Sequence, residues 1–308
     1  MELGLYVAPQ QGASYVDQLA AARTAERFGY TAFVRSDHYR AFTGAGLPGP
    51  TDTWVTLGAL ARETTTITLG AMVSAATFRL PGPLAVAVAQ VDAMSGGRIL
   101  FGLGTGWDER EHRAFGIPFP PLAERFDRLD EQLSIITGMW TTPDGQSFDF
   151  HGRHYHLEDC PALPKPQQRP HPPIVVGGSG PRRTPALAAK YADEFNLPPP
   201  FDGVSAAREV FDRVRAACHQ RDRDPSSLAL SVTLTTICGQ DAQEVASRTD
   251  LSSAGSPDVA GTPSEVAEQL AQYADLGVYR AYLRIPDLHD LEHIRLLGES
   301  VLPVLAGE

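Results

Sequence analysis

Eight apolar segments of β-strand character alternate with eight helical segments along this chain of 308 residues. The expected strands lie at residues 3–7, 31–35, 66–71, 98–103, 173–177, 194–196, 229–237 and 280–285. The expected helices cover residues 14–28, 52–63, 83–94, 107–115, 181–191, 205–221, 263–276 and 289–305. Eight strand–helix pairs in about 300 residues are what a (β/α)8 TIM barrel requires. The sequence therefore predicts an α/β protein with this barrel as a single domain over residues 1–308.

The interval between the fourth and fifth strands is too long for one crossover. It holds a further helical segment at 125–140, a polar and aromatic stretch at 148–157, and a proline-rich stretch at 161–173. We expect an insertion of about residues 120–172 between strands 4 and 5, with a hairpin that turns at His151-Gly152. A doubly wound sheet is disfavoured, because glycines 102, 104 and 106 follow a G-x-G-x-G pattern and not the dinucleotide-binding G-x-G-x-x-G.

Charge and cysteine content exclude several functional classes. A net charge of −11 disfavours nucleic acid or an anionic membrane as a partner. The three cysteines are widely spaced, which disfavours a disulfide framework or a cysteine-built zinc site. No apolar run approaches the ~20 residues of a membrane span, and no signal peptide is visible at the first residues. We expect a cytoplasmic homodimer that acts on a small molecule.

The fourth expected strand opens into a glycine-rich segment. The apolar run from Ile99 to Leu103 leads into Gly104-Thr-Gly106 and then into Trp107 and a charged helix start. A strand end without side chains leaves room for a bulky planar ligand, which neighbouring backbone groups can contact. In a TIM barrel, ligands bind at the C-terminal ends of the strands, so the residues after each strand are the candidate site.

Asp37 and His38 follow the second strand and form the only acid–histidine pair at a strand end. Histidine titrates near neutral pH, and an adjacent carboxylate can hold it protonated. The pair is therefore our candidate for acid–base catalysis. The alternative is a histidine in a surface loop.

The fifth strand ends in Gly177-Gly178-Ser179-Gly180, followed by two arginines. Small residues at a helix start expose backbone N–H groups, and Ser179 can cap the helix, so the segment is a candidate phosphate site. The alternative is a strand-to-helix turn with a glycine cap. A nucleophile elbow is excluded, since Pro181 stands where G-x-S-x-G requires its last glycine.

His151, His154 and His156 form the alternative metal cluster, with Glu158 and Asp159 after them. Histidines in a polar hairpin are usually solvated, and no second ligand set has zinc spacing. We predict no metal site.

Taken together, these motifs resemble the bacterial-luciferase-like family, in particular its branch that uses the deazaflavin coenzyme F420. The resemblance runs in family order over nearly the whole chain. Its motifs are Ser36-Asp37-His38-Tyr39, Thr77-Phe78-Arg79, the segment 92–107, Ala114-Phe-Gly-Ile-Pro-Phe119 and Gly177–Gly180. It implies a TIM barrel, a cofactor in the barrel mouth and hydride transfer at the C5 atom of the cofactor. Known members are dehydrogenases of alcohols and sugar phosphates, reductases of C=C and C=N bonds and, with FMN, monooxygenases.

The resemblance also implies roles for individual residues. Asp37 and His38 would lie beside the deazaflavin and its substrate. Met72 and Val73 fall where the family has a bulge with a non-prolyl cis peptide behind the cofactor ring. The further residues implied for the cofactor are Ser74, Ala75, Gly106, Gly177, Gly178, Ser179 and Gly180, and those for the substrate pocket are Phe42, Trp107, Asn196 and Arg284.

One departure from the family bears on the substrate. Trp107 stands where the sugar-phosphate dehydrogenases carry a catalytic glutamate, and the chain has only two lysines, Lys165 and Lys190, to clamp a phosphate. We therefore predict an F420-dependent oxidoreductase that reduces a C=C or C=N bond, with His38 as the donor of a proton or a hydrogen bond. The alternatives are an FMN-dependent monooxygenase, a non-catalytic flavin-binding relative and, more remote, a metal-dependent barrel hydrolase.

Overall fold

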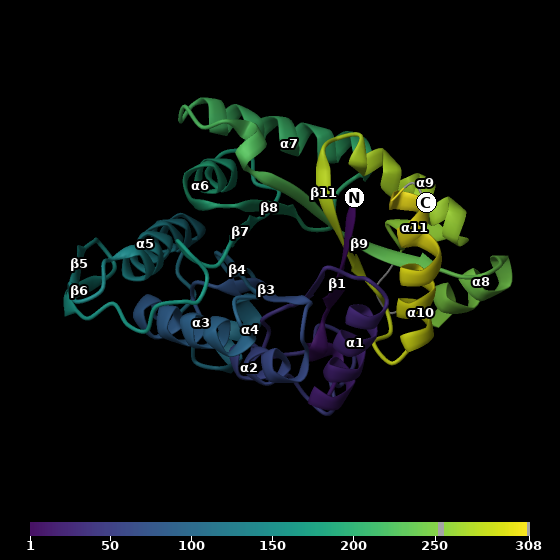
Figure 1. Ribbon diagram of the computed structural model, residues 1–308, viewed down its shortest axis with the longest axis horizontal. Helices are drawn as coiled ribbons and strands as arrows, with labels where there is room; N and C mark the ends of the chain where they lie inside the picture. The colour runs from purple at the N-terminus through teal and green to yellow at the C-terminus, as the bar shows by residue number, and fades with distance from the viewer. Residues whose placement is uncertain (252–255, 307–308) are drawn as a thin grey trace.

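Eight parallel strands form a closed barrel at the centre of the computed structural model, which describes residues 1–251 and 256–306. Figure 1 shows the helices around this barrel. Pairing of β8 with β9 and of β11 with β1 closes the sheet. The barrel strands are β1 (Glu2–Val7), β2 (Ala32–Arg35), β3 (Thr68–Ala75), β4 (Ile99–Gly104), β7 (Ile174–Gly177), β8 (Glu194–Leu197), β9 (Ala229–Cys238) and β11 (Val278–Arg284). The predicted TIM barrel is confirmed.

The barrel strands are rich in apolar residues because both of their faces are covered. Every residue of β4 is buried, for example. Outward-facing side chains pack against the helices in one large core, whereas Val34, Met72, Leu100 and Tyr282 belong to a separate small cluster of buried residues. Two-sided burial explains why the strands could be recognised in the sequence as short apolar runs.

The helices cover the outside of the barrel. They are α1 (Tyr15–Arg27), α2 (Thr53–Glu63), α3 (Pro81–Ser95), α4 (Glu109–Ala114), α5 (Leu122–Thr141), α6 (Arg183–Tyr191), α7 (Gly203–His219), α8 (Ala242–Leu251), α9 (Pro263–Ala274), α10 (Leu291–Leu296) and α11 (Leu302–Ala306). A π-helical turn at Leu297–Val301 joins α10 to α11, where the sequence predicts one helix. Single 3-10 turns lie at Pro9–Gln11 and Pro225–Ser227. None of the helices in the described ranges combines the length and the apolar character that crossing a bilayer needs.

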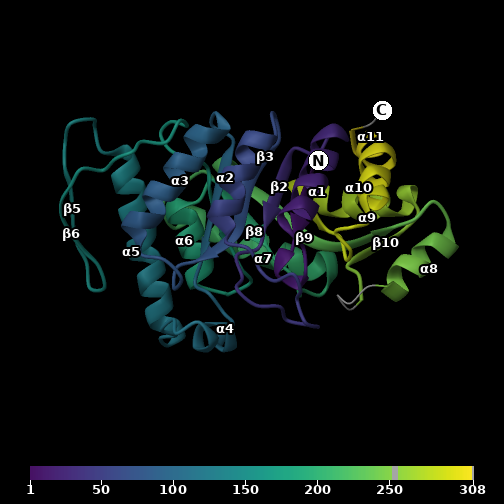
Figure 2. The ribbon, with the colours of Figure 1, turned by 90° about the horizontal axis from the view of Figure 1, so that it is seen from below.

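The long interval between β4 and β7 has two parts. Helix α5 packs between α3 and α6, so it takes a regular place in the ring of helices. The predicted hairpin follows it as β5 (Phe148–His151) and β6 (His156–Cys160), which pair antiparallel. Figure 2 shows the hairpin at one edge of the molecule, beyond α5. Of these two parts, the hairpin is the one that projects from the barrel.

One pair of elements was not predicted from the sequence. Helix α8 and the short strand β10 (Val259–Gly261) lie between β9 and α9, and β10 pairs in parallel with the end of β9. The start of α8 carries a helix-capping pattern that marks it, since Asp241 accepts the N–H groups of Gln243 and Glu244 at 2.9 Å each. A strand of three residues is too short to give a periodic pattern.

Candidate active site

Strand β3 bends at Met72-Val73, where the structure has a cis peptide bond between two non-proline residues. The β3–β4 register shifts between Ala71 and Ser74, which is the bulge that the family resemblance predicts. The glycines of β4 make room for this bulge, because a Cβ atom on Gly104 would lie 2.7 Å from Cγ2 of Val73. The space at Gly102 and Gly104 is thus taken by Val73 of the protein itself. Gly104 and Gly106 nevertheless line the cavity described next, whereas Gly102 does not.

A cavity of about 680 Å³, hereafter the mouth cavity, lies at the C-terminal ends of the barrel strands. This volume is in the range of pockets that hold a drug-sized ligand. The residues predicted from the sequence that line it are Asp37, His38, Phe42, Met72, Val73, Ala75, Gly106, Trp107, Gly177, Gly178, Ser179, Asn196 and Arg284. They come from six different strand ends, which the barrel brings to one place.

Two predicted cofactor residues do not line the mouth cavity. Ser74 is fully buried, and its hydroxyl accepts the indole N–H of Trp54 on α2 at 3.1 Å. It faces the helix layer because neighbouring residues of a strand point to opposite faces. Gly180 lies against α6 instead, where an added Cβ would be 3.1 Å from the hydroxyl of Thr184. The cofactor contacts implied for Ser74 and Gly180 stay predictions that the lining of the cavity does not support.

The loop after β7 differs from the predicted phosphate site in one respect. Helix α6 begins at Arg183 with Arg182 as its N-cap residue, so Ser179 does not cap the helix. Gly178 has a φ of 138°, which favours glycine, and its N–H donates to the carbonyl of Asn196 at 3.1 Å. The backbone from Gly177 to Ser179 borders the mouth cavity without being the first turn of a helix.

His38 pairs with a carboxylate that the sequence analysis did not identify. Its Nδ1 lies 2.9 Å from Oε2 of Glu111 on α4, and the other oxygen of Glu111 accepts the N–H of Tyr39. Glu111 is fully buried, whereas His38 is partly exposed to the mouth cavity. The prediction that the adjacent Asp37 is the partner of His38 is therefore wrong.

Asp37 belongs instead to a second charged group. Arg79 donates to Asp37 and, at 2.7 Å, to Oδ2 of Asp52, the N-cap residue of α2. Burial alone would lower the pKa of Arg79, but the charges of Asp37 and Asp52 outweigh it and raise that pKa above its ordinary value. Asp37 is thus charge-paired, and this pairing fixes the chain just before His38.

Three aromatic rings form one wall of the mouth cavity. The ring centroid of His38 lies 4.6 Å from that of Phe42 and 5.6 Å from that of Trp107, and Phe42 and Trp107 are 5.0 Å apart. Trp107 is 62% exposed and stands at the rim. These edge-on and tilted contacts hold the imidazole between two large apolar side chains.

Polar groups lie deeper in the barrel. Asn196 donates to the hydroxyl of Ser231 at 3.0 Å and accepts from the hydroxyl of Thr233 at 3.1 Å, so its amide is fixed. Arg284 also lines the mouth cavity but differs, because its side chain has no hydrogen bond or ion pair with any residue of the described ranges. Its charge lies close enough to Tyr6 to oppose the rise in the tyrosine pKa that burial causes.

The histidines of the hairpin do not assemble a metal site. The rings of His151 and His156 are 5.5 Å apart, while His154 lies 4.0 Å from Glu124 on α5. Within residues 1–251 and 256–306, no three histidine, cysteine or acidic side chains are grouped to hold a metal ion.

Comparison with known families gives one match, to the model described as luciferase-like monooxygenase, over residues 1–256. The chain belongs to the luciferase-like monooxygenase family. An F420-dependent glucose-6-phosphate dehydrogenase of Nakamurella multipartita is 30% identical over 330 aligned residues, which cover 97% of this chain and 94% of that protein. An FMNH(2)-dependent dimethylsulfone monooxygenase of Pseudomonas putida is 29% identical over 270 residues, or 73% of this chain and 72% of that protein.

The barrel itself is also shared. A crystal structure of a monooxygenase from Streptomyces bottropensis superimposes with a TM-score of 0.84, covers 99% of both chains and is 22% identical in sequence. A structural similarity at this level of sequence identity shows that the two proteins share a fold. This luciferase-like protein is therefore an enzyme of a family whose named relatives include both F420-dependent dehydrogenases and FMN-dependent monooxygenases.

Proposed function

We propose that the protein is a coenzyme F420-dependent oxidoreductase that transfers hydride between C5 of the deazaflavin and a small organic substrate. The observation that carries the proposal is the His38–Glu111 pair, which presents an oriented imidazole to the mouth cavity of a luciferase-like barrel. The similarity to F420-dependent dehydrogenases over nearly the whole chain supports the choice of cofactor.

The residues of the mouth cavity fit a deazaflavin. The bulge at Met72-Val73 offers an apolar surface for the ring, and the small residues Gly106 and Gly177 to Ser179 leave room for the tail beside their backbone. When bound, the cofactor supplies the hydride chemistry, taking or giving a hydride at C5. The protein contributes the binding and orientation of cofactor and substrate, and it excludes water from them.

His38 has a defined part in this scheme. Its Nδ1 is engaged by the buried Glu111, whereas its Nε2 has no hydrogen-bond partner among the described residues. The free nitrogen therefore holds or moves the proton that accompanies hydride transfer, as a positioned acid or base does. Glu111 acts through His38 by fixing which nitrogen faces the cavity, as a carboxylate does for other catalytic histidines.

The lining of the mouth cavity supports reduction of a C=C or C=N bond. Phe42 and Trp107 give its wall an apolar character, and neither lysine of the chain lines it. No carboxylate stands at position 107 to assist the oxidation of a sugar. These features favour an unsaturated substrate with a large apolar part over a sugar phosphate.

The cofactor experiment compares F420 and FMN on the purified protein. We expect F420 to bind more tightly, and turnover to consume reduced F420 one-for-one with reduced product, equally with and without air. Carbon replaces the flavin N5 in a deazaflavin, so the cofactor transfers hydride and reacts poorly with O₂. A requirement for FMN and O₂, with oxygen incorporated into the product, would contradict the proposal.

An FMN-dependent monooxygenase is the second candidate, which the dimethylsulfone monooxygenase among the relatives favours. The backbone contacts to a phosphate are common to both cofactors, so only the surroundings of the ring can separate them. A non-catalytic flavin-binding protein would bind a cofactor in the same titration but show no turnover with any of the tested acceptors.

A further inference from the structure

A second cavity of about 300 Å³ lies beside the mouth cavity, between the ends of β1 and β11 and the loop after His38. The two cavities share three lining residues, Ala8, Phe42 and Arg284. A volume of 300 Å³ is at the lower limit of pockets that hold an entire small ligand. This second cavity is therefore suited to one arm of a molecule that sits mainly in the mouth cavity.

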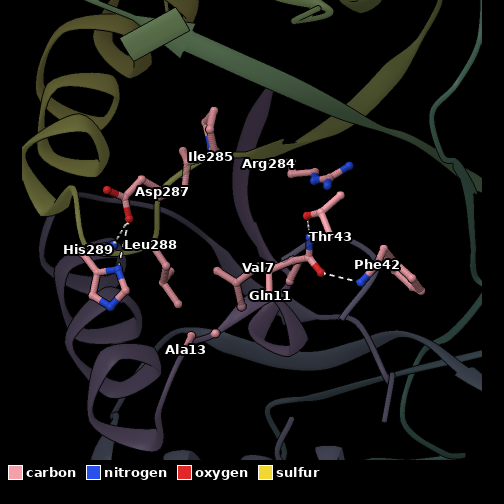
Figure 3. A pocket seen from close by; sticks show the side chains of 13 residues that line it. Val7, Gln11, Ala13, Phe42, Thr43, Arg284, Ile285, Asp287, Leu288 and His289 are labelled. Atoms are coloured by element: carbon pink, nitrogen blue, oxygen red, sulfur yellow. Dashed lines mark hydrogen bonds and ion pairs between the residues drawn. The ribbon is translucent and has the colours of Figure 1, made fainter. Parts of the chain in front are cut away.

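Most polar side chains in the second cavity are already bonded to one another, as Figure 3 shows. The amide of Gln11 accepts the N–H of Phe42 at 2.8 Å and donates to the hydroxyl of Thr43 at 2.6 Å. Asp287 accepts from both the backbone N–H and Nδ1 of His289, at 2.9 and 3.1 Å. These contacts leave few polar groups for a ligand.

The remaining surface has two components. Val7, Ala13, Ile285 and Leu288 supply apolar side chains. Arg284 supplies a cation with no partner in the part of the chain that the structure describes, and no dashed line reaches it in Figure 3. A guanidinium binds carboxylate or phosphate oxygens through two parallel hydrogen bonds, and a partly buried one gains most from such a partner.

We infer that the second cavity is a subsite for the apolar arm of the substrate, with an anionic group of the same molecule at Arg284, where the two cavities meet. The occupant is an elongated amphiphile, namely a carboxylic or phosphoric acid with an alkyl-like arm. Gln11 fixes Phe42 and Thr43 and so keeps the two cavities distinct. This inference rests on the proposed function only in naming that molecule a substrate.

The test uses straight-chain carboxylates from butanoate to dodecanoate, and the matching alcohols, titrated calorimetrically into the full-length protein without cofactor. We expect affinity to rise about fourfold with each methylene until the cavity is filled. Each carboxylate should bind about tenfold more tightly than its alcohol, and Arg284→Gln should abolish this difference. Equal affinity for acids and alcohols in the unaltered protein would overturn the role of Arg284.

Two variants of one residue test the position of the arm in opposite directions. Leu288→Trp fills the second cavity and should end the rise of affinity at a shorter chain, while Leu288→Ala should extend it to a longer one. Val16→Trp, on an exposed position of α1, is the matched control and should leave the series unchanged. An unaltered chain-length profile in both Leu288 variants, with intact folding by circular dichroism, would overturn the inference.

The failure of this inference can be told apart from the failure of the proposed function. If F420 does not bind but the dependence on chain length and charge persists, the subsite stands and the cofactor assignment falls. If F420 binds and supports turnover while the chain-length profile is flat, the subsite falls and the proposed function stands.

Discussion

Each end of the barrel holds an arginine between two carboxylates, yet the surroundings of the two groups differ. At the mouth, Arg79 joins Asp37 to Asp52 directly beside a cavity. At the opposite end, Arg280 lies 2.7 Å from Glu2 and 3.5 Å from Glu194. The residue types are the same in both places.

The space next to these groups makes the difference. Arg280 is buried and also donates to the hydroxyl of Tyr282 at 3.0 Å, so it is enclosed by protein. Burial raises the pKa of Glu194, and the charge of Arg280 opposes that rise. At the mouth, His38 and Arg284 border open volume and keep unused bonding capacity. We propose that His38 and Arg284 at the mouth are available to ligands, and that the charges at the other end stabilise the fold.

The largest expected effect is on turnover, at the mouth. His38→Ala should lower turnover by ~10²–10⁴-fold, the range for a positioned acid or base, and change cofactor affinity by no more than a few fold. Steady-state kinetics with reduced F420 and a cofactor titration measure both. His219→Ala, at an exposed position on α7, is the control. If turnover is unchanged, His38 is an ordinary loop histidine without a role in catalysis.

The second effect is on stability, at the opposite end. Arg280→Met leaves Glu194 buried without its partner and should lower the free energy of unfolding by about 3–5 kcal/mol. Denaturant unfolding measures the loss, and turnover per folded molecule should stay within about threefold of the starting protein. Arg113→Met removes an exposed ion pair of 4.0 Å with Glu109 and should cost less than about 1 kcal/mol. If both variants lose a similar amount of unfolding free energy, the buried charges at this end of the barrel do not stabilise the fold more than an exposed ion pair does.

A third prediction sharpens the account of the mouth. Glu111→Gln removes the charge that His38 bonds to, and should lower turnover by about 10–100-fold, the equivalent of one charged hydrogen bond. Glu111→Asp should restore part of the loss, and the ¹⁵N shifts of the His38 ring should show a changed distribution of the proton between its two nitrogens. The matched control is Glu109→Gln, at an exposed position on the same helix. If only stability changes, Glu111 is a structural residue.

The last prediction concerns a histidine away from the mouth cavity, where we expect an effect on stability alone. Burial, aided by the charge of Arg248, lowers the pKa of His293 to about 4, and its Nε2 accepts the N–H of Cys238 at 2.9 Å. Between pH 6.5 and 4 the unfolded chain binds a proton that the folded one does not. Stability is therefore complete above pH 6.5 and falls as the pH falls, by on the order of 2–3 kcal/mol.

His293→Gln should remove this component of the pH dependence, because the glutamine oxygen still accepts the N–H of Cys238 without titrating. Unfolding free energies measured from pH 7 to pH 4 test it, with His219→Gln as the control. If the unfolding free energy depends on pH identically in the variant and the starting protein, His293 is protonated in the folded state and the prediction is wrong. Turnover should change little in either case, since His293 does not line the mouth cavity.

The fold was predictable because buried parallel strands are read as short apolar runs. Most of the mouth cavity was predictable because barrel ligands gather at the C-terminal strand ends. The partner of His38 was not, because Glu111 is 73 positions away and nothing local separates it from Glu109, which is exposed. The direction of the Ser74 side chain, toward the helix layer, was not predicted for another reason. It follows a bulge, and a bulge resets the alternation of side chains along a strand.

Closure of the barrel by β1 and β11 has a consequence for how the protein is made. Glu2 and Arg280 are 278 positions apart, and Tyr6 and Arg284, which both line the mouth cavity, are paired in register. Contacts so distant in sequence form late and slowly. Until β11 emerges from the ribosome, β1 is an open edge with unpaired backbone groups, which invites aggregation. The mouth cavity, which is lined by residues of both β1 and β11, is therefore complete only after β11 has been synthesised and the barrel has closed.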